Sequence, residues 1–353
     1  MRHAGSAMNI LLIKTTSLGD VLHATPHIRA IRECYPEAHL TVLTAKGSAQ
    51  IYAHHPAVDR LVLFDHARFK ELGLGEPRAA LALIGETLEQ LNDREYELAF
   101  DLQGLARTVV FLYRVRARRK FVKGRWPGLG GFRNKQLHAI DEMSAVLAQA
   151  DIPVSDSAMA FYRLPEVLTS LCEKLASLEL TDLLESSEYG PYIVISPFTR
   201  WVSKNWPLER FIQAAERLSQ ERVVLITGTE GDRAAIAARM PSDISNLYNL
   251  AGMLSLPELA ELMSRAGLVI SGDSFPMHLA AAVQVPQLAL FGPTDEAKTG
   301  PRSENSRVLR PDDCAMCDKP DCRRACLEQI PVARVTSAAL SMLRGEPAVG
   351  AIQ

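Results

Sequence analysis

An acidic residue stands where the first apolar segment of the chain gives way to a helix. The apolar run of residues 9–14 predicts a strand buried on both faces, and the periodic run of residues 21–35 predicts a helix. In the polar segment 15–20 between them, Gly19 permits a tight turn and Asp20 begins the helix. A carboxylate at the edge of a sheet can act as a general base or simply cap the helix, and the spacing alone favours the cap.

A second polar turn, residues 271–278, follows a predicted strand and begins a helix predicted at residues 274–283. Ser274 is a good helix cap, and the free amide groups of the first turn, with the helix dipole, suit a diphosphate. Asp273 could orient an amide or hydroxyl of a ligand, and His278 could donate to a phosphate. The alternative is a capped helix with a histidine in the core.

A third segment, residues 196–207, joins a strand predicted at residues 192–195 to a helix that starts near Pro207. It contains several hydroxyl groups together with Arg200 and Lys204. Cations and hydroxyls at the entrance of a helix indicate phosphate binding. Solvated surface charge is the alternative interpretation.

The segment that follows Asp101-Leu102-Gln103-Gly104 is strongly basic. No acidic residue occurs before Asp141, and Trp126 and Phe132 are interleaved with the cations. Such a patch would attract an anionic acceptor or an anionic membrane surface, and a solvated basic face is the alternative. The formal net charge of −2 argues against a general nucleic-acid binder. The interval contains ten basic residues: Arg107, Arg114, Arg116, Arg118, Arg119, Lys120, Lys123, Arg125, Arg133 and Lys135.

Two α/β domains must position these segments. The chain of 353 residues is too long for one ordinary core. Strands alternate with helices in both halves, which predicts a doubly wound parallel sheet in each. We expect an N-terminal domain over residues 1–170, a linker over 171–190 and a C-terminal domain over 191–353, with residues 1–7 disordered. There is no G-x-G-x-x-G or Walker lysine pattern, which disfavours nicotinamide and P-loop chemistry.

Composition indicates an ordinary globular protein, with 47% apolar and 23% charged residues. No secretory signal precedes the first strand, and no apolar run reaches the roughly 20 residues that span a bilayer. We therefore expect a cytoplasmic protein that at most rests on the inner face of a membrane.

Four of the six cysteines form a C-x2-C-x4-C-x3-C cluster: Cys314, Cys317, Cys322 and Cys326. Four thiolates so close in sequence could bind zinc or an iron–sulfur cluster, although the spacing matches neither standard pattern. Reduced thiols or a local disulfide are the alternatives. Cys34 and Cys172 lie in apolar periodic stretches and are expected to be buried, reduced thiols.

Taken together, these segments resemble the ADP-heptose:lipopolysaccharide heptosyltransferases, glycosyltransferase family 9. The resemblance covers nearly the whole chain and keeps the order of the motifs. Any one motif is weak, but five in order are specific. They are residues 14–22, Asp101-Leu102-Gln103-Gly104, Lys204-Asn205-Trp206-Pro207, residues 272–281 except Phe275, and Phe291-Gly292-Pro293-Thr294.

The resemblance implies a GT-B fold, in which two Rossmann-like domains face each other across a cleft. It implies an inverting transfer that needs no metal or other cofactor, with an ADP-heptose-like nucleotide sugar as co-substrate. Asp20 matches the general base, and Lys204 matches a lysine that neutralises the leaving diphosphate. The residues expected to bind the donor are Thr199, Arg200, Asp232, Asp273, Ser274, Phe275 and His278. Those expected to bind the acceptor are Lys14, Ser17, Gly19, Gln103, Arg116, Arg118, Arg119 and Lys120.

One departure from the family pattern concerns the donor. Phe275 occupies a position that is usually Gly, so its side chain needs space there and the donor sugar stays open. The expected acceptor is an anionic glycolipid of the lipopolysaccharide core, and the expected protein is a monomer. Another sugar donor, another surface glycan, or a nucleotide- or metal-binding relative without catalysis are the alternatives. The presence of both Asp20 and Lys204 counts against the last of these.

Overall fold

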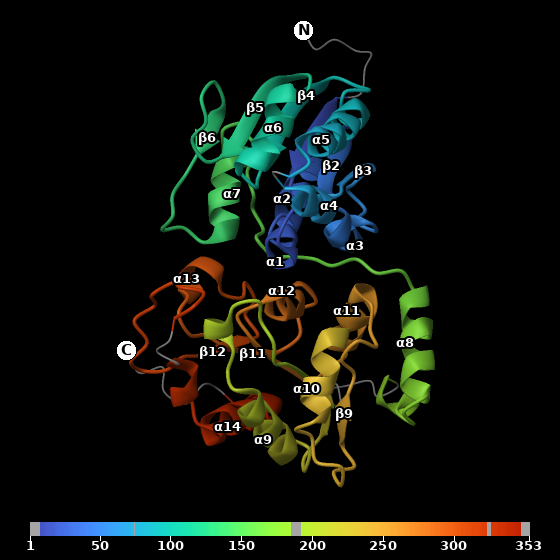
Figure 1. Ribbon diagram of the computed structural model, residues 1–353, viewed down its shortest axis with the longest axis vertical. Coiled ribbons are helices and arrows are strands. Elements are labelled where there is room, and N and C mark those ends of the chain that lie inside the picture. Colours follow the sequence, from blue (N-terminus) through green and yellow to red (C-terminus); the bar gives the residue numbers. More distant parts are fainter. Residues whose placement is uncertain (1–7, 74, 185–191, 323–325, 347–353) are drawn as a thin grey trace. The chain divides into compact units, whose positions relative to one another are not determined.

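The computed structural model describes residues 8–73, 75–184, 192–322 and 326–346. The disorder expected for residues 1–7 lies outside the described residues, as does the end of the expected linker. The chain divides into two compact units, Met1–Tyr162 and Arg163–Gln353. Each unit contains one six-stranded sheet (Figure 1).

The first sheet consists of β1 (Asn9–Ile13), β2 (His39–Ala45), β3 (Arg60–Phe64), β4 (Tyr96–Asp101), β5 (Ala117–Lys123) and β6 (Gly130–Phe132). All strands are parallel, in the order β3-β2-β1-β4-β5-β6. The central strand β1 is almost wholly buried, which explains its continuous apolar sequence.

The second sheet consists of β7 (Tyr192–Ser196), β8 (Val223–Ile226), β9 (Leu247–Asn249), β10 (Leu268–Gly272), β11 (Gln287–Leu290) and β12 (Ser306–Leu309). It is also parallel, in the order β12-β11-β10-β7-β8-β9. Numbered from the first strand of its own unit, it repeats the order of the first sheet. The predicted α/β class with two doubly wound sheets is confirmed.

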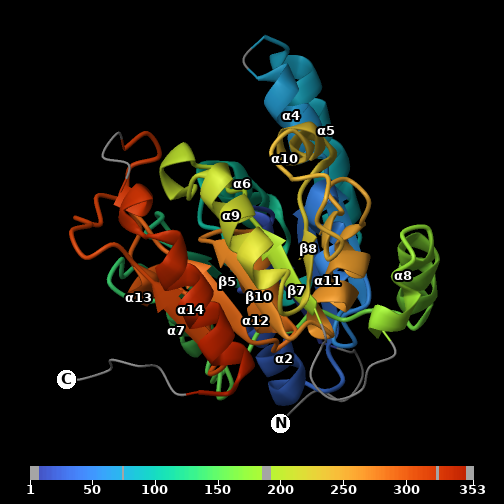
Figure 2. The same cartoon turned by 90° about the horizontal axis from the view of Figure 1, so that it is seen from below.

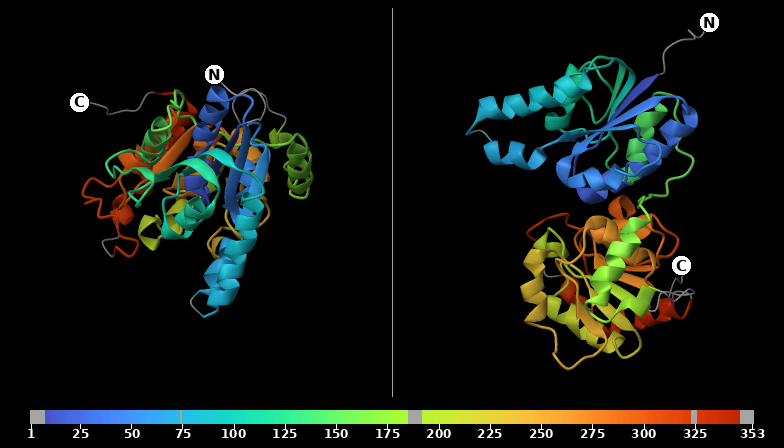
Figure 3. Two further views of the ribbon diagram at one scale, coloured as in Figure 1. Left: turned by 90° about the horizontal axis from the view of Figure 1, so that it is seen from above. Right: turned by 90° about the vertical axis from the view of Figure 1, so that its right-hand side faces the viewer.

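The helices of the first unit are α1 (Leu18–Leu22), α2 (Thr25–Cys34), α3 (Ala49–Tyr52), α4 (His66–Leu72), α5 (Pro77–Leu91), α6 (Ala106–Arg114) and α7 (Ala139–Ala148). Helix α5 contacts α6, and α2 contacts α7. The two pairs cover opposite faces of the first sheet (Figure 3). Because the helices cover the faces of the sheet, the loops lie at the ends of its strands.

The helices of the second unit are α8 (Glu166–Ala176), α9 (Leu208–Leu218), α10 (Arg233–Ala237), α11 (Leu256–Ser264), α12 (Phe275–Ala282), α13 (Glu296–Thr299) and α14 (Val332–Leu343). Helices α9 and α14 pack side by side against the second sheet (Figure 2). Helix α12 contacts α11 and the strands β10 and β11. The second sheet is therefore also covered by helices.

Helix α8 belongs to the second unit because it packs on α11. Lys174 Nζ donates to Glu258 Oε2 over 2.7 Å, and Ser170 Oγ donates to Glu258 Oε1 over 2.6 Å. The boundary between the units therefore falls after Tyr162, before the end expected for the N-terminal domain.

The helix predicted over residues 21–35 is two helices in the structure. Helix α1 ends at Leu22, and Pro26 stands in the first turn of α2. Proline is tolerated at that position because its missing N–H has no partner in a helix start. Cys34, expected in the core, is exposed because it is the last residue of α2.

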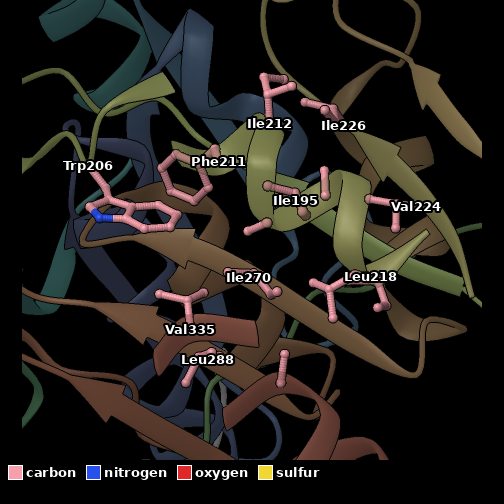
Figure 4. Packing of buried hydrophobic residues seen from close by; sticks show 14 of the residues in the cluster. Ile195, Trp206, Phe211, Ile212, Leu218, Val224, Ile226, Ile270, Leu288 and Val335 are labelled. Atoms are coloured by element: carbon pink, nitrogen blue, oxygen red, sulfur yellow. The ribbon is translucent and has the colours of Figure 1, made fainter. Parts of the chain in front are cut away.

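Side chains from α9 and from the strands form the core of the second unit (Figure 4). Trp206 and Phe211 pack edge to face with ring centroids 4.9 Å apart. The Trp206 indole N–H donates to the Ile330 carbonyl over 3.0 Å, which satisfies its polar atom. This anchor fixes the chain directly after Lys204.

Each sheet reverses its strand order at its centre, between β1 and β4 in the first sheet and between β7 and β10 in the second. Doubly wound sheets bind ligands at the carboxyl ends of the strands at such a switch point. The segments 14–20, 102–105, 197–207 and 273–274 follow these four strands. All four segments selected from the sequence therefore lie at a switch point.

Candidate active site

Asp20 lies in the first turn of α1, directly after the loop that follows β1. Its Oδ2 accepts hydrogen bonds from the Ser17 amide over 3.1 Å and from the Ser17 hydroxyl over 2.9 Å. Its Oδ1 lies 4.0 Å from Lys14 Nζ, and the side chain is 42% exposed. The carboxylate thus supports the start of the helix with one oxygen and is still accessible to a ligand.

The charge of Asp20 is held by its surroundings. Burial by itself would raise the pKa of Asp20, but Lys14, His23 and the hydrogen bonds from Ser17 outweigh it and hold the pKa below its ordinary value. Lys14 is 1% exposed, and burial lowers its pKa to about 8 although Asp20 and Asp101 oppose this shift. The switch point therefore holds an anion that faces a buried cation.

The turn after β4 forms the other wall of the first switch point. Asp101 is fully buried, and its Oδ1 accepts from the amides of Gln103 over 2.9 Å and Gly104 over 3.0 Å. Burial raises the pKa of Asp101 to about 6, against the opposing effect of hydrogen bonds from Gly104, Thr108 and Gln103. Gln103 Oε1 accepts from the Thr16 amide over 3.1 Å, so this turn contacts the loop that carries Asp20.

In the second unit, Lys204 and Asp273 form an ion pair at the switch point. Lys204 Nζ lies 2.6 Å from Asp273 Oδ2 and 4.4 Å above the centroid of the Trp201 ring. Thr294 donates its hydroxyl hydrogen to the same Asp273 oxygen over 2.5 Å. The structure therefore brings together the lysine and the aspartate that the sequence placed in two separate segments.

Thr199 and Ser274 lie beside this pair. The Thr199 amide donates to Asn205 Oδ1 over 2.8 Å, and its methyl group packs so closely on Gly272 that a Cβ there would lie 2.8 Å away. Ser274 is the residue before α12, and its hydroxyl donates to the Phe198 carbonyl over 3.4 Å. The loops after β7 and β10 therefore form one connected surface.

Phe275 is the first residue of α12 and is half-buried. His278 is buried one turn into the same helix. The two other expected donor residues lie in different surroundings. Arg200 is exposed in the loop after β7, and Asp232 follows β8, where it accepts from the amide and the hydroxyl of Thr229, each over 2.7 Å.

The expected acceptor residues fall into two groups on the first unit. Lys14, Ser17, Gly19 and Gln103 surround Asp20 at the carboxyl edge. The other four lie just before β5 and in its first half. The start of β5 is at the amino edge of the sheet, opposite to Asp20. Arg116 and Arg118 lie at that edge, whereas Arg119 and Lys120 pair with Leu98 and Ala99 in the middle of β4.

The cysteine cluster lies against the loop that follows β11. The Cys314 thiol donates to the Gly292 carbonyl over 3.0 Å. Burial, together with the neighbouring thiols of Cys314, Cys322 and Cys317, raises the pKa of the Cys326 thiol. Among the described residues, no disulfide joins the cysteines and no group of three or more His, Cys, Asp or Glu side chains is placed to hold a metal ion.

Three residues at the switch points were not singled out from the sequence. Arg107 was one of ten basic residues, but its guanidinium alone among them donates to Thr16 Oγ1, over 2.9 Å. Thr294 belongs to one of the sequence motifs, but the sequence assigned it no role. Trp201 lies near Lys204 in the sequence and was not given a role either. Their contacts join segments far apart in sequence, so spacing could not reveal them.

Two parallel sheets of the same strand order, each with charged loops at its switch point, place the protein in the GT-B class of folds. The chain belongs to glycosyltransferase family 9 (heptosyltransferase), whose family model matches residues 84–328. The protein is therefore a glycosyltransferase, as the resemblance implied. No helix in the described part of the chain is long and apolar enough to cross a membrane.

Relatives and solved structures agree with this assignment. The chain is 30% identical over 339 residues to lipopolysaccharide heptosyltransferase 1 of Pseudomonas aeruginosa, covering 89% of this chain and 87% of the relative. It has the fold of a family 9 glycosyltransferase from Veillonella parvula, with a TM-score of 0.84, 22% identity, and coverage of 98% and 100% of the two chains. The Escherichia coli heptosyltransferase WaaC, solved with ADP, gives a TM-score of 0.74 at 22% identity, covering 95% and 100%.

Proposed function

We propose that this glycosyltransferase moves a heptose, or a related sugar, from an ADP-linked donor to an anionic acceptor of the lipopolysaccharide core. The names of the relatives support the sugar and the acceptor class. The observation that carries the proposal is the Asp20 carboxylate, which is held as an anion at a switch point and remains 42% exposed. A purely capping residue would not need the buried Lys14 behind it.

In the proposed reaction, Asp20 Oδ1 accepts the proton of an acceptor hydroxyl while the oxygen attacks the anomeric carbon. The bond from that carbon to the nucleotide diphosphate breaks on the opposite face, so the configuration inverts. The low pKa keeps Asp20 ionised at neutral pH. Proton transfer by a positioned side chain accelerates such a step by roughly 10²–10⁴-fold.

Lys204 supplies the charge that the leaving diphosphate requires. Its ammonium is partnered by Asp273 and stacked on Trp201, which fixes its position before the donor arrives. We infer that phosphate oxygens share this ammonium, with the amides at the start of α12 as further donors. Because the cation comes from the protein, we expect transfer to need no divalent metal and to persist in a chelator.

The half-buried Phe275 ring at the start of α12 is the residue we propose to restrict the donor. The four basic residues just before β5 and in its first half are proposed to meet an anionic membrane surface. They are not proposed to bind the reacting hydroxyl, because Asp20 lies at the opposite, carboxyl edge of the sheet. We place the reaction in the cytoplasm, carried out by a monomer at the inner face of the membrane.

The decisive experiment replaces Asp20 and compares it with a residue that only caps. Asp20→Ala should abolish transfer while the affinity for ADP stays within about twofold, because the donor residues lie in the other unit. Asp65 is the matched control, since it also follows a strand and caps a helix, accepting from the Arg68 amide over 3.0 Å. Asp65→Ala should lose stability but retain turnover. Nearly full turnover in Asp20→Ala would remove Asp20 from its role.

A thermal-shift screen against nucleotide sugars tests the donor. Selective stabilisation by ADP-sugars is expected, since a ligand that binds only the native state raises the transition temperature. Stabilisation by NAD, or by a different nucleotide sugar alone, would contradict the proposed donor.

A further inference from the structure

Four hydrogen bonds tie the segment after β4 to the end of β1 and to the loop that leads to Asp20. The Leu102 amide donates to the Ile13 carbonyl over 3.0 Å, and Lys14 Nζ donates to the Leu102 carbonyl over 3.5 Å. Thr16 makes the other two bonds, through its amide and its hydroxyl, with Gln103 Oε1 over 3.1 Å and Arg107 over 2.9 Å. The contacts follow the Asp20 loop from its start to the residue before Ser17.

The segment that makes these contacts is itself firmly held. Asp101 closes the turn through two amides, as described above. Gly104 has φ +68, and a Cβ there would lie 1.6 Å from the Lys123 carbonyl oxygen, so only glycine fits. Helix α6 then begins at Ala106, which places Arg107 in its first turn. A rigid turn and a helix start therefore support a loop that has no regular structure of its own.

We propose that Gln103 and Arg107 are positioning residues that hold the Asp20 loop in its reactive geometry. The inference rests on the proposed function, since it assigns them a role in the transfer that Asp20 performs. Gln103 Oε1 and one Arg107 nitrogen are engaged by Thr16. Ser17, the next residue, donates both of its hydrogen bonds to Asp20 Oδ2. A displacement of Thr16 is thus passed directly to the carboxylate.

This role differs from direct binding of the acceptor, which the sequence suggested for Gln103. A residue that contacts the acceptor sets its binding, so its loss raises KM. A residue that orients the base acts on the chemical step, so its loss lowers kcat. Misplacement of a catalytic group by about 1 Å can cost as much as about 100-fold in rate.

The test compares Gln103→Met, which keeps the length but removes the acceptor oxygen, with Gln103→Glu, which keeps an oxygen at that position. Gln90→Met, on the exposed face of α5, is the matched control. We expect kcat to fall by about 10- to 100-fold in Gln103→Met with acceptor KM and ADP affinity within about twofold. Gln103→Glu should restore most of the lost kcat, and Gln90→Met should match the wild type.

A raised acceptor KM with unchanged kcat in Gln103→Met would overturn the proposal in favour of direct binding. Wild-type protein that transfers no sugar at all would instead refute the proposed function. If Gln103→Met does not fold, a double-mutant cycle of Thr16→Val and Arg107→Met tests the proposal instead. Because both remove one shared hydrogen bond, the double variant should lose little more kcat than either single variant. Additive losses would overturn the proposal.

Discussion

The two oxygens of Asp20 have different surroundings, and the proposed chemistry depends on this difference. Oδ2 is engaged by Ser17, whereas Oδ1 faces the buried Lys14. In the proposed reaction, the cap and the base, which are alternatives for the sequence, are two functions of this one side chain. What the sequence could not show is that Lys14 is buried beside Asp20, because that burial depends on the packing of β1 between two strands.

Replacement of Lys14 by Met should move the acid limb of the pH–rate profile. The pKa of Asp20 is held below its ordinary value partly by the Lys14 charge, so its removal raises that pKa. The proposed transfer needs ionised Asp20, and the activity of the variant should therefore be lost at a higher pH than that of the wild type. The measurement is kcat/KM between about pH 4 and pH 8, where the wild type should show no acid limb from Asp20 and the variant should show one.

Lys14→Arg is the control, since it retains the charge. An unchanged acid limb in Lys14→Met would show that Lys14 does not set the ionisation of Asp20. A fall in kcat without any shift along the pH axis would point to geometry alone.

At the scale of elements, the turn after β4 links ionisation to stability. Burial raises the pKa of Asp101 from an ordinary value of 3.8 to about 6. The native state therefore holds this proton more tightly than the unfolded state does. The resulting stability is fully present below about pH 4 and is lost as the pH rises through about 6.

Asp101→Asn should flatten this dependence, because the amide keeps an acceptor oxygen for Gln103 and Gly104 but cannot ionise. The free energy of unfolding, measured by urea titration, should fall from about pH 4.5 to pH 7.5 by about 2 kcal/mol more in the wild type than in the variant. Equal slopes in the two proteins would show that the Asp101 carboxyl is not perturbed by the fold.

The elements that the sequence predicted well are those with both faces buried. Strands β1, β7 and β10 are nearly continuous apolar runs, a pattern that predicts a strand buried on both faces. Strand β5 was missed because Arg118, Arg119 and Lys120 begin it, and only Phe121 and Val122 are buried. Arg118 and Arg119 are exposed near the start of this strand, which periodicity alone does not reveal.

At the scale of the molecule, the proposed donor residues are confined to the second unit. We therefore expect ADP to protect amides in residues 197–206 and 271–278 from hydrogen exchange, and to leave residues 14–20 nearly unchanged. The physical reason is that bound phosphate removes the local opening of the loops it contacts. ADP binding measured by mass spectrometry of exchanged peptides provides the test. Strong protection of the Asp20 loop alone would contradict the proposal that the nucleotide binds to the second unit.

The shared strand order gives each loop of one unit a topological counterpart in the other. The segment after β1, which leads to Asp20 in α1, corresponds to the segment after β7, which leads to Lys204. The buried Asp101 at the end of β4 corresponds to Asp273 directly after β10. In both units a lysine interacts with the later aspartate, Lys14 with Asp101 and Lys204 with Asp273. The same strand order is thus used in both units, but the segment after the first strand leads to an acidic residue in one unit and to a basic residue in the other. In the proposed reaction, one copy presents an anion to a reactant that loses a proton, and the other presents a cation to a product that gains negative charge.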